Sequence, residues 1–459
     1  MSELIQNLVQ KARKAQAQVE YWSQEQIDEM VAAVGWQAYS HAEECAVLAF
    51  EETGMGIFKD KLIKHQKKTL GALRDLHGLR TVGLIEEDQE LGLLKYAKPV
   101  GVIGALTPVT NASATLPGNC LPMLKTRNAV IFASHPRAKK TCKLNVEIMR
   151  RGLAQVGAPE DLIQCIEEPS IELTQELMRE VDLVIATGGA GMVKAAYSSG
   201  KPAYGVGAGN AITIVDETAD LDAAAKKIFL GKTFDYATSC SSENSVVIQE
   251  SIYDVFIEKL KGNGGYLCSA EEKEKLRKAM WPDGKHLNKK IVAQSPEVIA
   301  KIAEIEVPGD TKFIMVLGEK IGPEDMFSGE KLSIVLTLWK YSEFQDAIDY
   351  IQNITAYSGA GHSCGIHTSK EEHIRMLGEQ ARVSRIMVNQ PQSYGNSGNY
   401  NNGMPITLTL GCGTWGNNIT TENIYWKHFL NITWVSKPID PVIPDEAKLF
   451  GEHWKKYGK

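Results

Sequence analysis

Short apolar runs alternate with helical stretches along most of this chain, and this alternation constrains its fold more than any other feature. From about residue 90 the β-branched runs are candidate strands: LLKYA, VGVIGAL, NAVIFAS, LIQCIEE, VDLVIATGG and AITIVD. Helical segments such as 139–156 and 171–179 separate several of them. Strands connected through helices pair in parallel within one sheet, and the helices cover its faces. The pattern therefore predicts an α/β fold with a mostly parallel sheet.

The alternation resumes after a helix predicted near residues 252–261, where the candidate strands are KFIMVL, LSIVLTLW, SCGIHT and RIMVN. One packed core rarely exceeds about 250–300 residues, so at least two domains are expected. Apolar residues at helical spacing predict helices over residues 3–83. The Gly-, Asn- and Ser-rich segment 390–416 predicts a long ordered loop. The tail from residue 439 is expected to run over the surface.

Charge and hydropathy exclude several classes of partner. The formal net charge of −6 argues against a broad basic surface, so no nucleic-acid partner is expected. No uninterrupted apolar run approaches the roughly 18 residues that cross a bilayer. The N-terminal stretch MSELIQNLVQKARKAQ lacks the apolar core of a signal peptide. We expect a cytoplasmic protein with no membrane partner.

The eight cysteines are scattered and form neither a CxxC pair nor a zinc-like cluster. In a long chain of this kind they are expected to be free thiols, with no metal bound. Most are expected to be buried small hydrophobic residues, and at most one or two to be reactive.

A glycine-rich turn in VDLVIATGGAGMVKAAYSSG is the first cofactor signal. The strand 181–186 leads into Gly188, Gly189 and Gly191, and a helix follows. Backbone N–H groups at such a turn can approach a pyrophosphate. The spacing is not GxGxxG, so a tight structural turn is the alternative interpretation. A second glycine cluster at residues 205–209 favours a nucleotide site.

Cys240 is the candidate nucleophile because it lies in a small polar loop, FDYATSCSSENSVVI, between a helical region and an apolar strand. Core cysteines are rarely packed among such neighbours. The alternative is a structural thiol, which describes about four in five cysteines. A free thiol is only a few per cent thiolate at neutral pH but is intrinsically nucleophilic, and a loop position beside backbone amides is expected to raise the thiolate fraction.

The chain resembles the aldehyde dehydrogenase superfamily over nearly its whole length. The motifs TPVTN, LKTRNAVIF, ATGG, TADLD, the cysteine loop and SIYDVFIEKL occur in that family's order. The resemblance is to the CoA-acylating branch, which includes acetaldehyde and succinate-semialdehyde dehydrogenases. The branch markers are SHPRAKK (134–140), YSSGKPAYGVGAGN (197–210), GAGHS (359–363), VNQP (388–391) and TLGCGTWGNN (409–418).

The resemblance implies three structural parts. Residues 1–86 and 102–208 would form a Rossmann-type NAD(P)-binding domain. Residues 209–415 would form an α/β catalytic domain. A strand pair within 87–101 and the segment 416–459 would mediate oligomer contacts, in a homodimer or homotetramer.

The resemblance also assigns the chemistry. Cys240 would be the nucleophile, and Asn111 would hold the oxyanion together with the Cys240 backbone N–H; otherwise Asn111 is a helix cap. Hydrolytic members carry a water-activating glutamate where this chain has Gly205. A glycine cannot deprotonate water, so transfer of the acyl group to CoA is expected.

The remaining cofactor contacts are carried over position by position. Glu330 would hold the nicotinamide ribose, with Leu332 where a phenylalanine is common; a solvated loop acid is the alternative for Glu330. The family lysine for the adenosine ribose is absent, and the stretch from Ser134 replaces it. Its cations would admit a 2′-phosphate or bind CoA phosphates, or would simply be a solvated helix start. NAD and NADP both stay open. The implied cofactor-binding set is Thr107, Pro108, Ser134, His135, Arg137, Gly188, Gly189, Gly205, Val206, Gly207, Glu330 and Leu332.

His362 is a branch marker without a visible partner, and the sequence favours a structural hydrogen-bonding role over an accessory catalytic one. The loop VNQPQSYGNSGNYNNG is closer to the succinate-semialdehyde type, which predicts a small aldehyde with an anionic tail, such as succinate semialdehyde or sulfoacetaldehyde. An acylating acetaldehyde dehydrogenase, a hydrolytic dehydrogenase and an inactive structural member of the fold are the alternatives.

Overall fold

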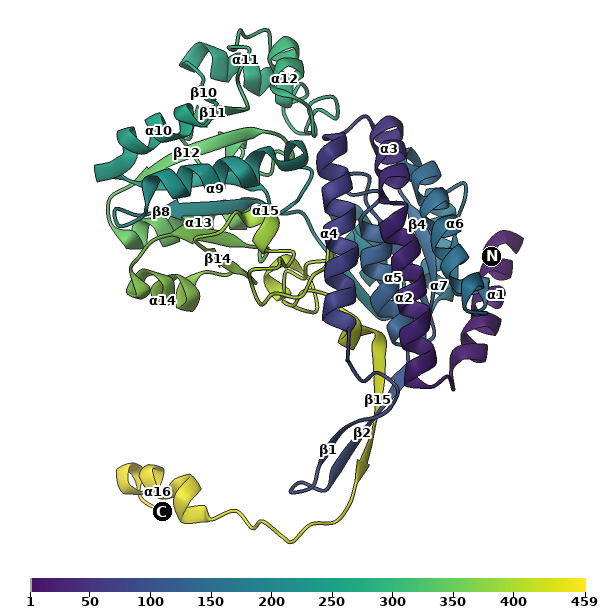
Figure 1. Ribbon diagram of the computed structural model, residues 1–459. Helices are drawn as coiled ribbons and strands as arrows, with labels where there is room; N and C mark the ends of the chain where they lie inside the picture. The colour runs from purple at the N-terminus through teal and green to yellow at the C-terminus, as the bar shows by residue number, and fades with distance from the viewer. Residues whose placement is uncertain (1) are drawn as a thin grey trace.

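The computed structural model describes residues 2–459 and consists of two α/β parts and a projecting arm (Figure 1). The first part is built on a five-stranded sheet whose strand order is β5-β4-β3-β6-β7 and whose pairs are all parallel. Its strands are β3 (Val102–Thr107), β4 (Ala129–Ser134), β5 (Ile163–Cys165), β6 (Leu183–Thr187) and β7 (Ala203–Val206). Every residue of β3 and β4 is buried, as expected for a parallel sheet covered on both faces.

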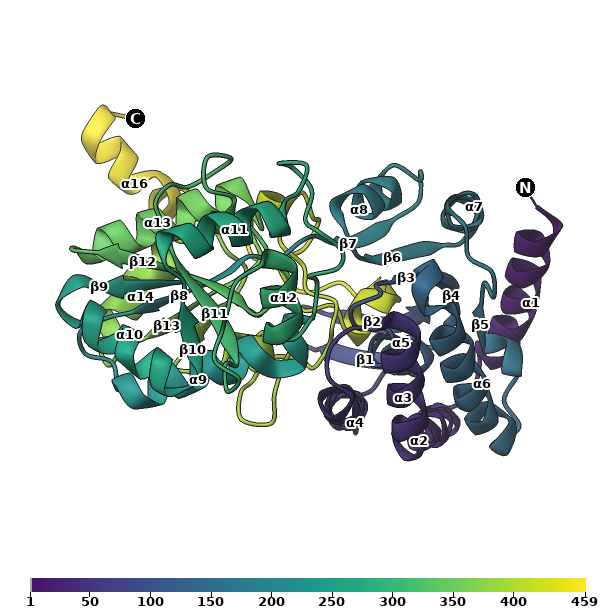
Figure 2. The same ribbon diagram turned by 90° about the horizontal axis from the view of Figure 1, so that it is seen from above.

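Eight helices accompany this sheet. They are α1 (Glu3–Val19), α2 (Gln24–Ser40), α3 (Ala42–Thr53), α4 (Phe58–Leu76), α5 (Thr115–Lys125), α6 (Lys139–Gln155), α7 (Ile171–Glu180) and α8 (Ala190–Tyr197). The first four confirm the helices predicted over residues 3–83. Both predicted helices between strands, 139–156 and 171–179, are also present as α6 and α7. Figure 2 shows α4 beside the second part of the molecule.

The second part is built on a seven-stranded parallel sheet with the order β10-β11-β12-β9-β8-β13-β14. Its strands are β8 (Ala211–Val215), β9 (Glu243–Gln249), β10 (Gly265–Leu267), β11 (Phe313–Leu317), β12 (Val335–Tyr341), β13 (Cys364–His367) and β14 (Ile386–Val388). Its helices are α9 (Leu221–Thr233), α10 (Tyr253–Gly262), α11 (Ala270–Met280), α12 (Pro296–Ala303), α13 (Phe344–Tyr357) and α14 (Glu371–Gln380). The prediction of an α/β fold with parallel sheets is thus confirmed.

The segment after β14 returns to the first part and fills the space between the two sheets. It contains the short helix α15 (Gln392–Gly395) and otherwise has little regular structure, as predicted for residues 390–416. Lys68 of α4 donates hydrogen bonds to Ser397 and to the Gly398 carbonyl. Asp75, also on α4, accepts the backbone N–H of Ile406 at 2.7 Å. These contacts fix the loop against α4.

The arm is a three-stranded antiparallel sheet of β1 (Gly83–Asp88), β2 (Leu93–Pro99) and β15 (Leu430–Ser436), followed by α16 (Glu446–Tyr457). The strand pair begins a few residues before the expected 87–101. The helix α16 was not predicted: residues from 439 were expected to be only a surface extension, but Asp445 caps a helix there. Figure 1 shows α16 standing away from both α/β parts. Among residues 2–459, no helix is both long and apolar enough to cross a membrane.

Candidate active site

The carboxyl ends of β3, β4 and β6 form the first half of the site. In chain order β4 and β5 lie on one side of β3, and β6 and β7 lie on the other. The strand order therefore reverses between β3 and β6, which is where open α/β sheets bind their ligands. Thr107 ends β3, Ser134 ends β4, and Gly188 and Gly189 follow β6. The structure thus brings these four predicted cofactor residues to one sheet edge.

A pocket at this edge fits a nucleotide cofactor. Apolar side chains form much of its wall, together with Ser134 and His135: Leu106, Ala133, Met178, Met192 and Ala195. The hydroxyls of Thr107 and Ser134 are buried and have no hydrogen-bond partner among the described residues. Gly189 is the N-cap of α8 and leaves the helix N-terminus without a side-chain cap. Two unpartnered hydroxyls and open backbone amides suit the ribose and phosphates of a dinucleotide.

The basic stretch after Ser134 is partly engaged by the protein itself. Arg137 donates a 2.7 Å hydrogen bond to the Thr53 carbonyl. Lys139 pairs with Glu168 at the surface. His135 lines the nucleotide pocket, and burial followed by the nearby Arg137 charge lowers its pKa. The residues from Ser134 to Ala138 carry no carboxylate, but Glu52 of α3 accepts the backbone N–H groups of Lys140 and Thr141 at 2.8 Å at the start of α6. These contacts do not decide between NAD and NADP.

Cys240 lies in the turn that precedes β9, between α9 and β9 as the sequence predicted. Its Sγ is 3.2 Å from Nε2 of His362, a residue 122 positions away in the chain. Nδ1 of His362 is 2.8 Å from the Ser363 hydroxyl. The Cys240 backbone N–H has no hydrogen-bond acceptor among residues 2–459. The turn therefore presents a thiol, an imidazole and a free N–H donor together.

The thiol and the imidazole are both neutral in the resting site. Burial and, next, the nearby Glu330 carboxyl together raise the pKa of Cys240 to about 12. The expectation that backbone amides of the loop increase the thiolate fraction is therefore wrong for the resting site, because burial outweighs them. Burial lowers the pKa of His362 to about 3, and the charge of Arg385 acts in the same direction. At neutral pH the site therefore stores the proton on sulfur, and the unprotonated His362 is placed to accept it.

The rate of Cys240 alkylation is expected to follow this raised pKa. Because the thiolate is the nucleophile, its fraction rises about tenfold per pH unit at every pH well below the thiol pKa. In the cofactor-free enzyme, labelling of Cys240 by iodoacetamide should keep rising from pH 7 to pH 10, measured by mass spectrometry of the cysteine peptide. A plateau near the ordinary thiol value of 9.0 would contradict the burial effect.

Arg385 is a structural member of the site that the sequence analysis missed. It is buried and donates to the His362 carbonyl at 2.9 Å and to the Gly411 carbonyl at 2.8 Å. A further bond joins it to Asn423. The guanidinium thus holds the backbone of the histidine loop to the segment that crosses between the two sheets. No local pattern around Arg385 indicated this role.

Asn111 lies between β3 and α5, and its side-chain orientation is fixed by Lys64 of α4. The Lys64 ammonium donates to Asn111 Oδ1 at 2.8 Å, so this atom is the carbonyl oxygen. The amide nitrogen therefore faces the other way, 3.5 Å from the Thr238 carbonyl in the cysteine turn. The structure brings the predicted oxyanion donor to the side of Cys240.

Asp235 anchors both Lys64 and the cysteine turn. It is fully buried, and Lys64 and Lys61 contact its Oδ2 at 2.7 and 3.3 Å. Asp235 and the next two residues have φ values of 50°, 48° and 59°, which is a left-handed backbone for non-glycine residues. Each such residue costs on the order of 1–3 kcal/mol, so the surrounding contacts have to hold it. Neither Lys64 nor Asp235 was identified from the sequence.

Glu330 and the second glycine cluster meet beside the cysteine. The buried Glu330 carboxyl accepts the Gly209 N–H at 3.1 Å, and burial raises its pKa to about 8. The Gly209 backbone packs so closely on the cysteine turn that a Cβ there would lie 1.9 Å from the Cys240 carbonyl oxygen. Val206 and Gly207 lie at the end of β7 and just beyond it. Pro108 follows β3 directly and is half-buried.

Leu332 follows Glu330 closely but takes part in packing. Its φ is 41°, its carbonyl accepts the Ala293 N–H, and its side chain joins an apolar cluster with Met55 and Val292.

Gly205 has no room for the side chain that hydrolytic members carry. A Cβ at this position would lie 2.6 Å from Val193 Cγ1 and 2.8 Å from the ring of Tyr197. The Tyr197 hydroxyl in turn accepts the Gly205 N–H at 2.9 Å. The tyrosine ring therefore lies where a glutamate side chain at Gly205 would begin. No water-activating carboxylate can project from this position without a rearrangement of α8.

All eight cysteines are free thiols, as expected, and only Cys165 and Cys240 are not fully buried. No group of His, Cys, Asp and Glu side chains in residues 2–459 has the geometry of a metal site.

A nucleotide pocket at the edge of one parallel sheet, together with a cysteine that contacts an imidazole and an asparagine oriented toward the cysteine turn, is the arrangement of an aldehyde-oxidising dehydrogenase, and comparison with known proteins agrees. The model of the aldehyde dehydrogenase family matches residues 1–265. A sulfoacetaldehyde dehydrogenase of Acholeplasma sp is 50% identical over 459 residues, covering 99% of this chain and 95% of that protein. An acylating sulfoacetaldehyde dehydrogenase of Bilophila wadsworthia is 51% identical over 454 residues, which is 98% of each chain.

Two solved structures extend the likeness to the whole fold. An acetylating aldehyde dehydrogenase from Geobacillus thermoglucosidasius has a TM-score of 0.93 at 37% identity, covering 96% of this chain and 98% of that one. A propionaldehyde dehydrogenase from Rhodopseudomonas palustris, solved with bound CoA and an acylated cysteine, has a TM-score of 0.85 at 28% identity, covering 94% and 97%. This chain belongs to the aldehyde dehydrogenase family, in its CoA-acylating branch. It is an NAD(P)-dependent oxidoreductase that uses CoA as a co-substrate.

Proposed function

We propose that this enzyme oxidises sulfoacetaldehyde, with NAD(P)⁺ and CoA, to sulfoacetyl-CoA, with NAD(P)H and one proton as the other products. The observation that carries the chemistry is the 3.2 Å contact between Cys240 and His362 beside the amide of Asn111. The substrate follows from the two relatives at 50% and 51% identity, whose names specify sulfoacetaldehyde. Succinate semialdehyde, with a longer anionic tail, is the second candidate.

We propose that Cys240 attacks the aldehyde carbon while its thiol proton passes to His362 Nε2, so that proton transfer accompanies the formation of the C–S bond. The developing oxyanion would be held by the Cys240 N–H and the Asn111 amide, which is already oriented by Lys64. NAD(P), held by the residues at the carboxyl ends of β3, β4 and β6, would supply the acceptor for the hydride of the reacting carbon. Glu330 would hold the adjacent ribose from its place against Gly209. These steps leave the acyl group on Cys240 as a thioester, and His362, whose pKa is lowered by burial, releases its proton to solvent as the one proton of the overall reaction.

Transfer of the acyl group to CoA follows from the lack of a base at Gly205. The thiol of CoA attacks the thioester carbon, Cys240 leaves as the thiolate, and the proton of CoA returns to the cysteine by way of His362. In hydrolytic members a carboxylate at this position activates water. Here the ring of Tyr197 occupies the space that a side chain at Gly205 would need. The reaction is chemically reversible, so acyl-CoA reduction uses the same residues.

A panel of aldehydes with and without CoA tests the proposed substrate. Acetaldehyde, succinate semialdehyde and sulfoacetaldehyde are compared by the initial rate of NADH or NADPH formation. We expect the largest kcat/KM for sulfoacetaldehyde and little turnover of any aldehyde without CoA. A clear preference for acetaldehyde would reject an anionic substrate, and full turnover without CoA would reject acyl transfer.

We also propose a separate function for each of the three structural parts. The part on the five-stranded sheet, from 1–86 and 102–208, binds NAD(P), and the part on the seven-stranded sheet, from 209–415, supplies Cys240. The arm, from 87–101 and 416–459, joins copies of the chain into a homodimer or homotetramer. We place the enzyme in the cytoplasm.

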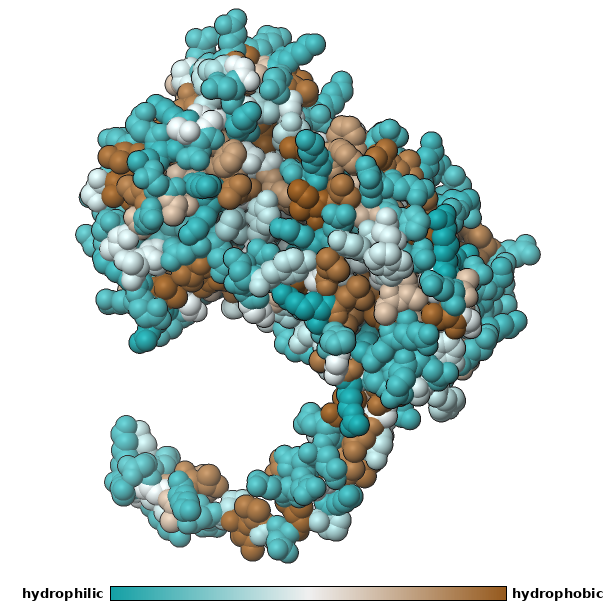
Figure 3. All heavy atoms as spheres, viewed as in Figure 1, coloured by the Kyte–Doolittle hydropathy of each residue, from teal (hydrophilic) through white to brown (hydrophobic). Residues whose placement is uncertain are grey.

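Apolar side chains along the arm support a homo-oligomer. Val442 and Ile443 are 86% and 83% exposed, and Leu449 and Phe450 of α16 are also largely exposed. Figure 3 shows apolar residues along the arm, away from the two α/β parts. Isolated apolar groups at a surface are normal, but a continuous apolar segment that packs on nothing in its own chain marks an interface.

Charge placed on the arm is expected to separate the copies. A Val442→Asp, Ile443→Asp double variant should lower the oligomer mass measured by light scattering after size exclusion. The matched control is Ile171→Asp, because Ile171 is 74% exposed on α7 and lies outside the arm. An unchanged mass in the double variant would refute the role of the arm.

A further inference from the structure

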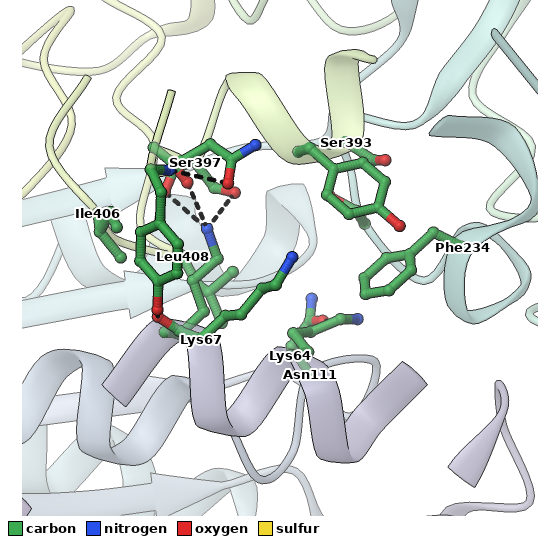
Figure 4. A pocket seen from close by; sticks show the side chains of 14 residues that line it. Lys64, Lys67, Asn111, Phe234, Ser393, Ser397, Ile406 and Leu408 are labelled. Carbon is green, nitrogen blue, oxygen red and sulfur yellow. Dashed lines mark hydrogen bonds between the residues drawn. The ribbon is translucent and has the colours of Figure 1, made fainter. Parts of the chain in front are cut away.

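A pocket next to the cysteine turn is lined by three lysines of α4. Lys64, Lys67 and Lys68 come from consecutive turns of this helix, and Ser239 and Asn111 border the same pocket on the side of Cys240. Phe234 and Leu408 supply apolar wall (Figure 4), and the ring of Tyr394 also lines the pocket. An aldehyde whose carbonyl reaches Asn111 would therefore leave its tail in a space with lysine side chains along one wall. Of these, Lys64 is ion-paired with Asp235 and burial lowers the pKa of Lys68 to about 7.

Two of the three lysines have no hydrogen left to donate. An ammonium group has three N–H donors. Those of Lys64 bond to Asn111, Asp235 and Thr238, at 2.8, 2.7 and 2.8 Å. Those of Lys68 bond to the Ser397 carbonyl, the Ser397 hydroxyl and the Gly398 carbonyl. Both side chains therefore hold the walls of the pocket and do not bind a ligand directly.

Lys67 differs from its two neighbours. Its ammonium makes no hydrogen bond or ion pair with any described residue, and lies 5.7 Å from the centre of the Tyr394 ring. Figure 4 shows its side chain extending between the Ser397 cluster and Phe234, with no dashed line to its nitrogen. Of the nearby carboxylates, Asp235 is paired with Lys61 and Lys64, and Asp60 accepts the Asp235 N–H.

Two unpartnered hydroxyls complete the lining. The Ser393 hydroxyl is buried, on a residue only 7% exposed, and has no hydrogen-bond partner among the described residues. Tyr394 is half-buried, and its hydroxyl makes no hydrogen bond with another described residue; burial raises its pKa to about 12, so it keeps its proton. A buried hydroxyl without a partner is uncommon and points to a missing acceptor. A cation and two hydroxyl donors form a set that suits an anion with several oxygens.

We infer that Lys67, with the hydroxyls of Ser393 and Tyr394, binds the anionic tail of the aldehyde and so determines substrate specificity. This inference rests on the proposed function, since it needs an anionic substrate. A sulfonate has three oxygens, one for each of the three donor groups. An uncharged aldehyde such as acetaldehyde makes none of these bonds, so it gains nothing from Lys67.

Substitution of Lys67 by methionine tests the inference, because methionine keeps the length and removes the charge. We expect kcat/KM for sulfoacetaldehyde to fall about 10- to 100-fold, as for loss of hydrogen bonds to a charged group. The value for acetaldehyde should stay within about twofold, which a merely structural defect would not allow. Lys67→Arg should recover most of the lost activity. The matched control is Lys59→Met, since Lys59 is exposed on the same helix outside the pocket.

The outcomes separate this inference from the proposed function. If the unaltered enzyme prefers sulfoacetaldehyde and Lys67→Met retains that preference, Lys67 is not the tail-binding residue and the proposed substrate stands. If the unaltered enzyme prefers acetaldehyde, the proposed substrate itself is wrong. Inhibition by ethanesulfonate gives a second readout: we expect it to compete with the aldehyde and to weaken in Lys67→Met and Ser393→Ala. Equal inhibition of all variants would overturn the inference.

Discussion

Cys240→Ala is expected to reduce the aldehyde-dependent formation of NAD(P)H by at least about 1,000-fold, as removal of a catalytic nucleophile does in other enzymes. The reason is that no second thiol can take its place. Its Sγ is the sulfur in contact with His362, and every cysteine except Cys165 and Cys240 is buried. The loss should appear in kcat, while binding of NAD(P), measured by fluorescence quenching, should stay close to that of the unaltered enzyme.

Cys165→Ala is the matched control, because Cys165 is the other cysteine that is not fully buried and lies on β5. It should retain nearly full activity. The two variants also identify which cysteine carries the acyl group. After incubation with aldehyde and NAD(P)⁺, mass spectrometry should find an acyl adduct on the unaltered protein and on Cys165→Ala, but not on Cys240→Ala. Turnover retained by Cys240→Ala would show that another group carries the acyl chain.

Asn111→Ala is expected to lower kcat by about 100- to 1,000-fold, because loss of one oxyanion donor costs roughly 2.7–4 kcal/mol of barrier. The effect should be large because the amide is already oriented. Lys64 fixes Oδ1 at 2.8 Å, and thereby directs the amide nitrogen toward the cysteine turn. The aldehyde KM should change far less than kcat, since the interaction strengthens only as charge develops on oxygen.

Asn111→Asp serves as the companion variant. It keeps the size of the side chain and an oxygen for Lys64, but it removes the donor, so activity should be lost with little loss of thermal stability. Alkylation of Cys240 by iodoacetamide needs no oxyanion donor, so it should proceed in Asn111→Ala at the rate of the unaltered enzyme. In Asn111→Asp it should be slower, because the added carboxylate raises the pKa of the thiol further, as Glu330 does. If either Asn111 variant keeps full activity with the aldehyde, the Cys240 backbone N–H alone stabilises the oxyanion, and the role of Asn111 is refuted.

Much of the fold could be predicted from the sequence because its signals are local. A buried parallel strand appears in the sequence as a short run of apolar, β-branched residues. The runs VGVIGAL, NAVIFAS and VDLVIATGG contain β3, β4 and β6. The strand expected to start at residue 332 begins instead at Val335, because Leu332 has a positive φ that no apolar pattern reveals. The helix α16 was missed because the prolines that precede it dominate the local composition.

Only the site residues that belong to a family motif could be predicted from the sequence. Cys240, Asn111 and Glu330 were identified by family order, and the structure places all three around the cysteine turn. Lys64 and Arg385 were missed because their partners, Asn111 and His362, are 47 and 23 residues away. Such contacts depend on how helices and loops meet in space, and single-residue patterns do not record them. The left-handed backbone that begins at Asp235 has no sequence signal either.

His362 is a residue that a motif identifies but whose contact partners the sequence does not reveal. The motif GAGHS marks His362, but the sequence indicates no partner for it and therefore favours a structural role. In the structure the imidazole makes both kinds of contact, to the Ser363 hydroxyl and to the Cys240 thiol. The fold shows that one imidazole contacts both the Ser363 hydroxyl and the Cys240 thiol, and its accessory catalytic role stays a proposal.

The measurement that tests acyl transfer to CoA most directly is a rapid-mixing experiment on the enzyme with NAD(P)⁺ and sulfoacetaldehyde, with CoA left out. We predict a burst of NAD(P)H equal to one molecule per active site, followed by a much slower rate, because the thioester on Cys240 has no base at Gly205 to drive its hydrolysis. Addition of CoA should restore continuous turnover at once. Steady NAD(P)H formation without CoA, at the rate seen with it, would contradict the account.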